Sequence, residues 1–163
     1  MTVVAVTGAR GFRKGEEEIA RGIVRKTLEG LQGVTEFRTG AAFGVDTVAC
    51  EVGLNSFKKA WHRLYVPDQP HNADVVEMFD LWRDARRADI IRMPKGSSYR
   101  DRNIAMVEGA EMVCAFPSTG EEIVRSGTWM TVRLARRAGV PLLVVPLSGE
   151  KGWVENGAER VHA

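Results

Sequence analysis

The chain has few of the residues that cross-link small secreted domains or hold structural metals. Its two cysteines, Cys50 and Cys114, sit in apolar stretches far apart in sequence, and neither belongs to a CxxC or CxxxH pattern. We therefore expect neither a disulfide nor a zinc site. The three histidines, His62, His71 and His162, are scattered without a partner at metal-ligand or catalytic-dyad spacing. We expect no metal site of any kind.

Long apolar runs and a strong excess of one charge are also missing. No segment reaches the length of a membrane-spanning helix and no basic leader opens the chain, so we expect a cytoplasmic protein. The net charge of +2 is far from the balance that would by itself indicate a nucleic-acid binder. The GxSxG, P-loop lysine and HExxH motifs are absent, which leaves the enzyme classes defined by them without support.

The length and hydrophobic content of the chain are typical of one α/β domain. With 163 residues, 44% of them hydrophobic, the chain can bury about two thirds of its unfolded surface in a single core. We assign residues 1–147 to this domain and residues 148–163 to a polar, loosely held tail that Trp153 could dock. The apolar faces of the predicted helices are also compatible with a homodimer.

Strand and helix patterns alternate along the domain. Val3 to Thr7 is a continuous apolar and β-branched run that ends in Gly8, which favours a strand buried on both faces of a parallel sheet. Core strands are further predicted at Thr35–Thr39, Trp61–Val66, Met112–Phe116 and Pro141–Val145, and helices at Gly15–Leu31, Val45–Phe57, Ala73–Arg87, Arg100–Glu108 and Gly127–Ala138. The alternation predicts a Rossmann-like, doubly wound, mainly parallel sheet of about five core strands in the order 3-2-1-4-5, with helices on both faces. Because this order reverses between the first and fourth strands, a ligand crevice is expected beyond their carboxyl ends.

Two glycine-containing loops follow the first and second strands. In the first, Thr7 and Gly8 lead to Arg10, which could bind a phosphate or carboxylate as a bidentate donor, although a glycine here can also be a simple turn. In the second, Gly40, Ala41 and Gly44 form a run of small residues whose backbone amides could face an anion. Asp46 then either stabilises the first turn of its helix or serves a ribose hydroxyl or a catalytic step.

A polar loop follows the fourth strand, from Pro117 to the start of a helix at Ser126, Gly127 and Thr128. Unpaired amides, hydroxyl groups and the helix dipole together would form an anion site there, whereas a plain N-cap accounts for Ser126 alone. Glu121 and Glu122 in the same loop are, with Asp46, the candidate catalytic carboxylates.

The stretch from Arg83 to Arg102 has a local basic excess, which is either a solvated face or part of a binding surface. Within it, Tyr99 stands beside arginines and could stack on a base while they bind phosphate. Arg102 and Asn103 complete this polar element.

Taken in order, these loops resemble the SLOG superfamily, which groups DNA-processing protein A (DprA), the LOG phosphoribohydrolases and small YspA-like phage and bacterial proteins. Thr7 to Arg10 resembles the first-strand Gly-Ser-Arg turn, Thr39 to Asp46 the Ser-Gly-Gly-Ala-x-Gly-Ile-Asp loop, and Ser126 to Thr128 the Ser-Gly-Ser/Thr helix start. Arg102 and Asn103 match part of the Arg-Asn-Arg element of DprA, but Ile104 replaces its second arginine. No glutamate follows Thr128 at the LOG catalytic position.

We therefore expect a protein that binds or senses a nucleotide or nucleotide-derived phosphorylated ligand and needs no cofactor. The alternatives are a LOG-like N-glycosidic phosphoribohydrolase, which would need a carboxylate near the anomeric carbon, and a DprA-like single-stranded DNA binder.

Overall fold

The structure, a computed structural model, describes residues 2–70 and 87–159. Its strands are β1 (Thr2–Gly8), β2 (Val34–Gly40), β3 (Trp61–Val66), β4 (Ala88–Arg92), β5 (Met112–Phe116), β6 (Leu142–Val144) and β7 (Trp153–Glu155). Its helices are α1 (Glu17–Glu29), α2 (Val45–Ser56), α4 (Tyr99–Val107) and α5 (Gly127–Ala138). The predicted helix at Ala73–Arg87 lies outside the described residues except for Arg87. In the described part of the chain, no helix has the length and apolar character needed to cross a membrane.

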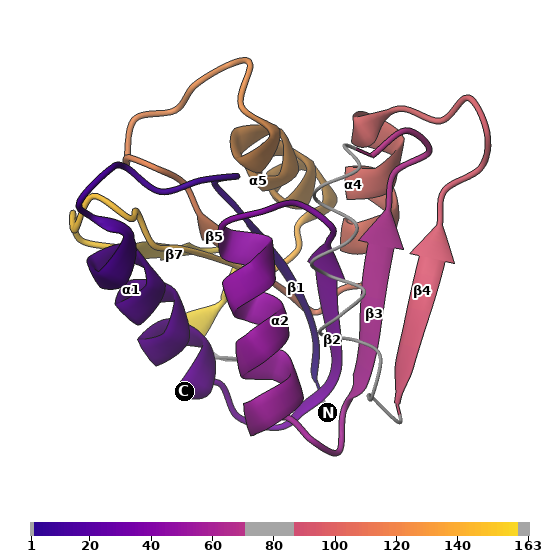
Figure 1. Cartoon of the computed structure of the whole chain (residues 1–163), viewed down its shortest axis with the longest axis horizontal. Helices are drawn as coiled ribbons and strands as arrows, with labels where there is room; N and C mark the ends of the chain where they lie inside the picture. The colour runs from indigo at the N-terminus through magenta and orange to yellow at the C-terminus, as the bar shows by residue number, and fades with distance from the viewer. Residues whose placement is uncertain (1, 71–86, 160–163) are drawn as a thin grey trace.

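The strands form one sheet in the order β4-β3-β2-β1-β5-β6-β7 (Figure 1). All neighbouring pairs are parallel except β6 and β7. The five predicted core strands are therefore present, adjacent and in the predicted order, and the α/β class is confirmed. The order reverses at β1, which pairs with β2 on one side and β5 on the other.

The sheet has seven strands rather than about five. β4 is a short edge strand whose side chains are mostly solvent-accessible, so its sequence lacks the apolar run of a core strand. β7 falls within the residues that we expected to form a loosely held tail, and it pairs with β6 through only three residues. Trp153 does dock this segment, because its ring stacks on Trp129 of α5 with the ring centroids 6.2 Å apart.

The core consists of two layers on opposite faces of the sheet. Along β1, Val4 and Val6 face the layer formed by α1 and α2, whereas Ala5 faces the layer formed by α4 and α5. This alternation is the period of two that a strand imposes on its side chains. Figure 1 shows α1 and α2 together in front of the sheet and α5 behind it. Because both faces are covered, the carboxyl ends of β1 and β5 are left as a place where loops can surround a ligand.

Candidate ligand-binding cleft

The start of α5 presents hydrogen-bond donors without partners. Ser126 is the N-cap, and its Oγ accepts a hydrogen bond from the amide of Trp129 at 3.3 Å. The amides of Gly127 and Thr128 have no hydrogen-bond partner among the described residues, and neither does the Thr128 hydroxyl, although Thr128 is only 6% exposed. The first amides of a helix have no acceptor within the helix, so these groups are available to donate to water or to a ligand.

The loop after β1 lies opposite this helix start. Gly8 packs directly on α2, because a Cβ at Gly8 would come within 2.5 Å of the Val45 side chain. The amide of Ala9 donates to the carbonyl of Phe116 at 3.1 Å, which fixes the loop against the end of β5. Arg10 is exposed, and its backbone amide has no partner in the described part of the chain. Thr7 is 9% exposed, and its hydroxyl forms no hydrogen bond within that part.

The third wall of the cleft comes from α4. Ser98 and Asp101 form a capping box, in which the amide and hydroxyl of Ser98 lower the pKa of the exposed Asp101 carboxyl. This cap starts the helix at Tyr99. The guanidinium carbon of Arg10 lies 4.7 Å from the centroid of the Tyr99 ring, and that of Arg102 lies 5.6 Å from it. Two cations thus contact one aromatic ring at the edge of the cleft.

Arg102 is fixed by the protein itself. Its Nε donates to the side-chain oxygen of Asn103 at 2.8 Å, and its Nη1 donates to the carbonyl of Tyr65 at 3.3 Å. With only 7% of its surface exposed, Arg102 is a rigid component of the wall. Arg10 differs from it, because its exposed side chain can change rotamer at low cost.

The loop between β2 and α2 supports the cleft more than it lines it. Gly40 leaves room for two charged groups, since a Cβ there would lie 2.5 Å from Arg102 Nη1 and 2.6 Å from Asp46 Oδ2. Gly44 has a φ of +83°, and a Cβ there would collide with the carbonyl of Ala9. Asp46 does reach the cleft, and its Oδ2 accepts a hydrogen bond from the amide of Ala42 at 3.1 Å.

Together these walls enclose a cleft of about 310 Å³ at the carboxyl ends of β1 and β5. Nine of the predicted residues line it: Thr7, Gly8, Arg10, Asp46, Arg102, Asn103, Ser126, Gly127 and Thr128. The further lining residues are Ala9, Gly11, Ala42, Tyr99, Ser118 and Met130. Met130 could have been found from the sequence, because it follows Ser126 by one helical turn and therefore shares its face. That these residues bind a ligand stays a prediction.

The remaining predicted residues do not line the cleft. Gly40 and Gly44 have the packing roles described above, Ala41 is buried beside Cys50 and Leu64, and Pro117 is buried where its carbonyl accepts the amide of Leu147 at 2.8 Å. The fold therefore accounts for these four residues without a ligand.

The two glutamates of the β5–α5 loop also lie away from the cleft. Glu121 is exposed. Glu122 forms ion pairs with Arg136 at 2.9 Å and Arg133 at 3.1 Å, and hydrogen bonds from these two side chains, Arg136 first, hold the pKa of its carboxyl below the ordinary value. Asp46 is therefore the one carboxylate among the described residues that line the cleft.

The basic stretch from Arg83 to Arg102 is described only in part, because Arg83 and Arg86 lie outside the described residues. Within the described part, Arg87 donates to the carbonyl of Lys59 at 2.7 Å, and Arg102 is buried in the cleft wall. These two arginines are used by the protein, so the cationic surface open to a partner is smaller than the sequence suggests.

No family model and no curated protein matches this chain. Among solved structures, DNA processing protein A (DprA) from Streptococcus pneumoniae is similar, with a TM-score of 0.61 and 18% identity over 90% of this chain and 50% of that chain. The structure of TM1055, a structural-genomics target, aligns with a TM-score of 0.49 and 16% identity over 87% of this chain and 72% of that chain. The resemblance to DprA that the loop motifs indicated is thus confirmed at the level of the fold, and this chain spans about half the length of that protein.

Proposed function

We propose that the cleft binds a nucleotide or a nucleotide-derived phosphorylated ligand. One observation supports this most directly. Hydrogen-bond donors that have no partner among the described residues, from two segments distant in sequence, surround a cleft of about 310 Å³ that also holds an arginine–tyrosine contact. Small-molecule sites have volumes of about 300 to 1,000 Å³, so a mononucleotide suits this space better than a larger cofactor.

The phosphate is expected at the start of α5. There the amides of Gly127 and Thr128 and the Thr128 hydroxyl can donate to its oxygens, and the helix dipole adds a favourable potential. Gly127 lets the ligand approach, since nothing lies within 4 Å of the position that a Cβ would take. Arg10 can leave the Tyr99 ring and add a charge-assisted hydrogen bond.

The base and sugar are expected toward α4. Tyr99 and Met130 offer an aromatic face and a polarisable thioether to a planar base. The side-chain nitrogen of Asn103 can donate to a base edge or a ribose hydroxyl. Within the described part of the chain it makes one long contact, 3.8 Å to the sulfur of Met130, while the side-chain oxygen accepts from Arg102. The DprA-like fold is consistent with a ligand at this switch point.

The test is a thermal-shift panel of adenine and guanine nucleotides, their cyclic and ribosylated derivatives, and the matching nucleosides. A ligand at about 100 times its dissociation constant stabilises the folded state by roughly 2.7 kcal/mol, which raises the Tm of a domain of this size by about 5 to 10 °C. We expect at least one phosphorylated compound to give such a shift and its nucleoside to give a smaller one. A panel in which nucleosides and nucleotides behave alike would refute the phosphate site.

Asp46 favours a second candidate, hydrolysis of the N-glycosidic bond of the bound nucleotide. Its carboxylate reaches the cleft, and general acid or base catalysis needs such a group within hydrogen-bond distance of the reacting atoms. Chromatography of nucleoside monophosphates after incubation with the protein would reveal a released base. Release that persists in Asp46→Asn would remove this residue from the reaction.

A further inference from the structure

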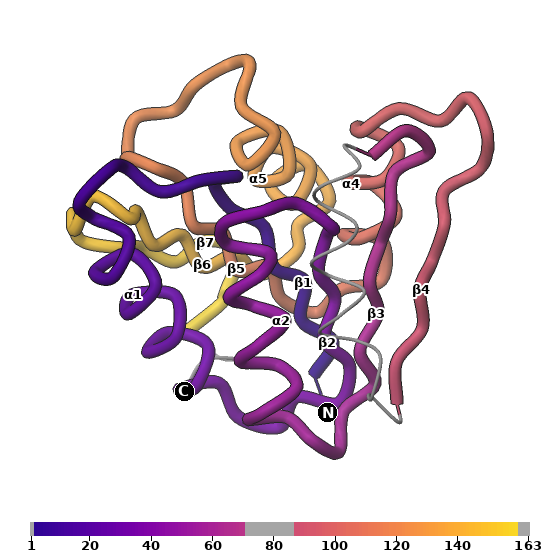
Figure 2. Tube along the Cα trace, in the orientation of Figure 1, coloured from indigo at the N-terminus to yellow at the C-terminus, as the bar shows by residue number. Residues whose placement is uncertain are grey.

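The ten-residue path from Pro117 to Ser126 connects β5 to the open start of α5. Figure 2 shows this loop, coloured orange, as a wide arc above α5, next to the yellow C-terminal segment. Only Ser118 and Ser126, near its two ends, line the cleft. The position of these residues and of the Gly127 amide therefore depends on what holds the rest of the arc.

Two carboxylates anchor the arc through hydrogen bonds, and the first of them, Glu122, is part of the arc itself. Glu122 lies between Arg133 and Arg136 of α5, accepting from Arg133 Nη1 at 3.1 Å and from Arg136 Nη1 at 2.9 Å. Arg133 Nη2 also donates to the carbonyl of Val124 at 2.9 Å. The two arginines, separated by one turn of α5, thus bind the far limb of the arc to the helix that it precedes.

The second carboxylate comes from the C-terminal segment. Glu150 Oε2 accepts from the amide of Gly120 at 2.6 Å and from the hydroxyl of Ser148 at 2.8 Å. A Cβ on Gly120 would lie 2.9 Å from the same oxygen, so glycine permits the carboxylate to approach the backbone this closely. The near limb of the arc is thereby bound to residues beyond β6.

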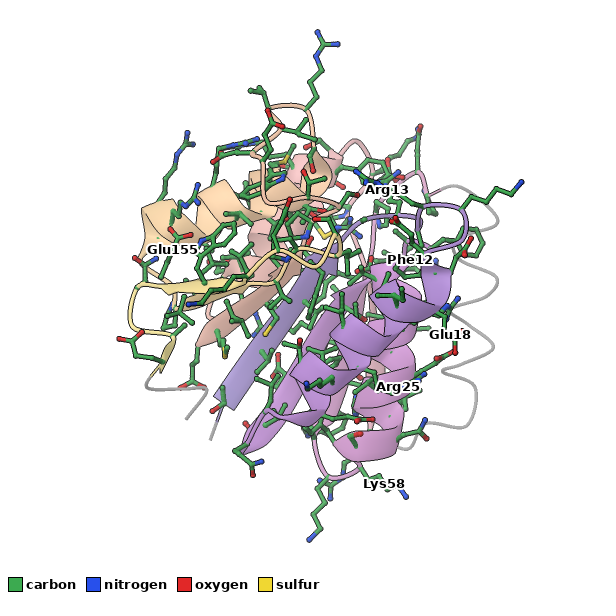
Figure 3. All side chains as sticks on the ribbon, turned by 90° about the vertical axis from the view of Figure 1, so that its left-hand side faces the viewer. Phe12, Arg13, Glu18, Arg25, Lys58 and Glu155 are labelled. Carbon is green, nitrogen blue, oxygen red and sulfur yellow. The ribbon has the colours of Figure 1, made fainter. Side chains whose placement is uncertain are left out.

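Arg136 joins the first anchor, Glu122, to β7. Its Nε and Nη2 donate to the two carboxylate oxygens of Glu155 in β7 at 2.7 and 3.1 Å, while its Nη1 is used by Glu122. Figure 3 shows Glu155 beside α5. Glu155 is held in turn by the indole nitrogen of Trp153 at 3.0 Å. One guanidinium group therefore connects the arc, α5 and β7, and a lysine could not replace it because it lacks the planar fork of donors.

We propose that Arg136 and Glu150 are positioning residues of the cleft, and that the segment from Ser148 to Glu155 belongs to the ligand site although it does not line it. The inference rests on the proposed function, because its consequence is the affinity for a phosphorylated ligand. The anchors hold the arc in one conformation before the ligand arrives, so that binding does not have to order it. Without them, the ligand meets an arc with several conformations, and the fraction competent to bind falls.

The variants Glu150→Ala, Glu150→Gln and Arg136→Lys test this inference, with Lys151→Ala and Arg137→Ala as matched controls. Both control residues are exposed neighbours on the same segments, and their side chains form no hydrogen bond in the described part of the chain. Calorimetry with adenosine 5′-monophosphate and with inorganic phosphate gives the affinity. Hydrogen exchange of the amides from Gly120 to Val124 gives the order of the arc without any ligand.

We expect Glu150→Ala and Arg136→Lys to weaken binding about three- to tenfold, the scale of one hydrogen bond, and to speed exchange in the arc but not in the later turns of α5. Glu150→Gln retains an acceptor for the Gly120 amide, so its affinity and its exchange rates in the arc should be close to those of the wild type. Affinity and exchange equal to those of the controls would overturn the positioning role. If neither these two probes nor any compound of the nucleotide panel binds the wild-type protein, the proposed function fails instead, and the exchange rates alone decide whether Arg136 and Glu150 order the arc.

Discussion

Gly127→Val tests the cleft at its most open point. Gly127 occupies the first turn of α5 and lines the cleft, and nothing lies within 4 Å of the position that a Cβ would take. The β-carbon of a valine there meets no protein atom within 4 Å, and valine is a better helix former than glycine. The free energy of unfolding should therefore stay within about 0.5 kcal/mol of the wild-type value, as for other exposed substitutions.

Ligand binding should respond very differently. The isopropyl group would occupy the space in which an anion meets the amides of Gly127 and Thr128, so at least one hydrogen bond to a charged group is lost. Such a bond contributes about 1.5 to 3 kcal/mol, which corresponds to a roughly 10- to 150-fold weaker affinity. Calorimetry with the best compound of the nucleotide panel measures this loss, and thermal unfolding confirms that the variant is folded.

Gly22→Val is the matched control. Gly22 lies in α1, is exposed, and likewise has nothing within 4 Å of a Cβ. The same substitution on another helix should leave the affinity unchanged. Wild-type affinity in folded Gly127→Val, or an equal loss in Gly22→Val, would refute a phosphate site at the start of α5.

Three further outcomes are expected. Arg10→Ala should weaken binding of the same ligand by about 1.5 to 3 kcal/mol with little change in Tm, since this arginine is exposed and its side chain has no hydrogen bond or ion pair with the described residues. Unchanged affinity by calorimetry would make it surface charge. Burial lowers the pKa of His62 below its ordinary value of 6.5 and outweighs the carbonyl of Phe57, which raises it. The folded state thus favours neutral His62, so its contribution to the free energy of unfolding is fully present above pH 6.5 and declines as the pH falls from there toward the folded-state pKa. Urea unfolding at several pH values should show this decline, and His62→Phe should reduce it. Single-stranded DNA should bind weakly and with little dependence on length, and nanomolar affinity at physiological salt would instead favour the DNA-binding alternative.

The core of the fold could be predicted from sequence because its signals are local. The continuous apolar runs specified the buried parallel strands, and α5 begins and ends at the predicted residues because Ser126 caps it and Gly139 closes it with a φ of +68°. β4 and β7 were not assigned as strands. Their few residues are partly exposed at the edges of the sheet, and the pairing of β7 with β6 depends on a return of the chain that no local pattern encodes.

The site was predictable to the extent that topology determines it. The loops after β1 and β5 meet because the carboxyl ends of adjacent parallel strands lie at the same edge of the sheet, which is why Arg10 and Gly127 line one cleft. The direction of a loop side chain is not determined in this way. Glu122 follows the same strand as Ser126, yet it turns toward Arg133 and Arg136 and away from the cleft, because two cations on α5 compensate its charge there.

The glycines of the predicted loops illustrate how a motif can combine two kinds of requirement. At Gly8, Gly40 and Gly44 a Cβ would collide with Val45, Arg102 or the backbone of the loop after β1, so these positions need glycine for the fold alone. At Gly11 and Gly127 a Cβ would meet nothing within 4 Å, although both residues line the cleft. Conformation explains neither of these two, since neither has a positive φ. Gly127 also stands at the start of a helix, beside amides that have no partner among the described residues, which is what close approach of a ligand would require. The support for a ligand therefore comes from Gly11, Gly127 and the donors around them rather than from the number of glycines in the motif.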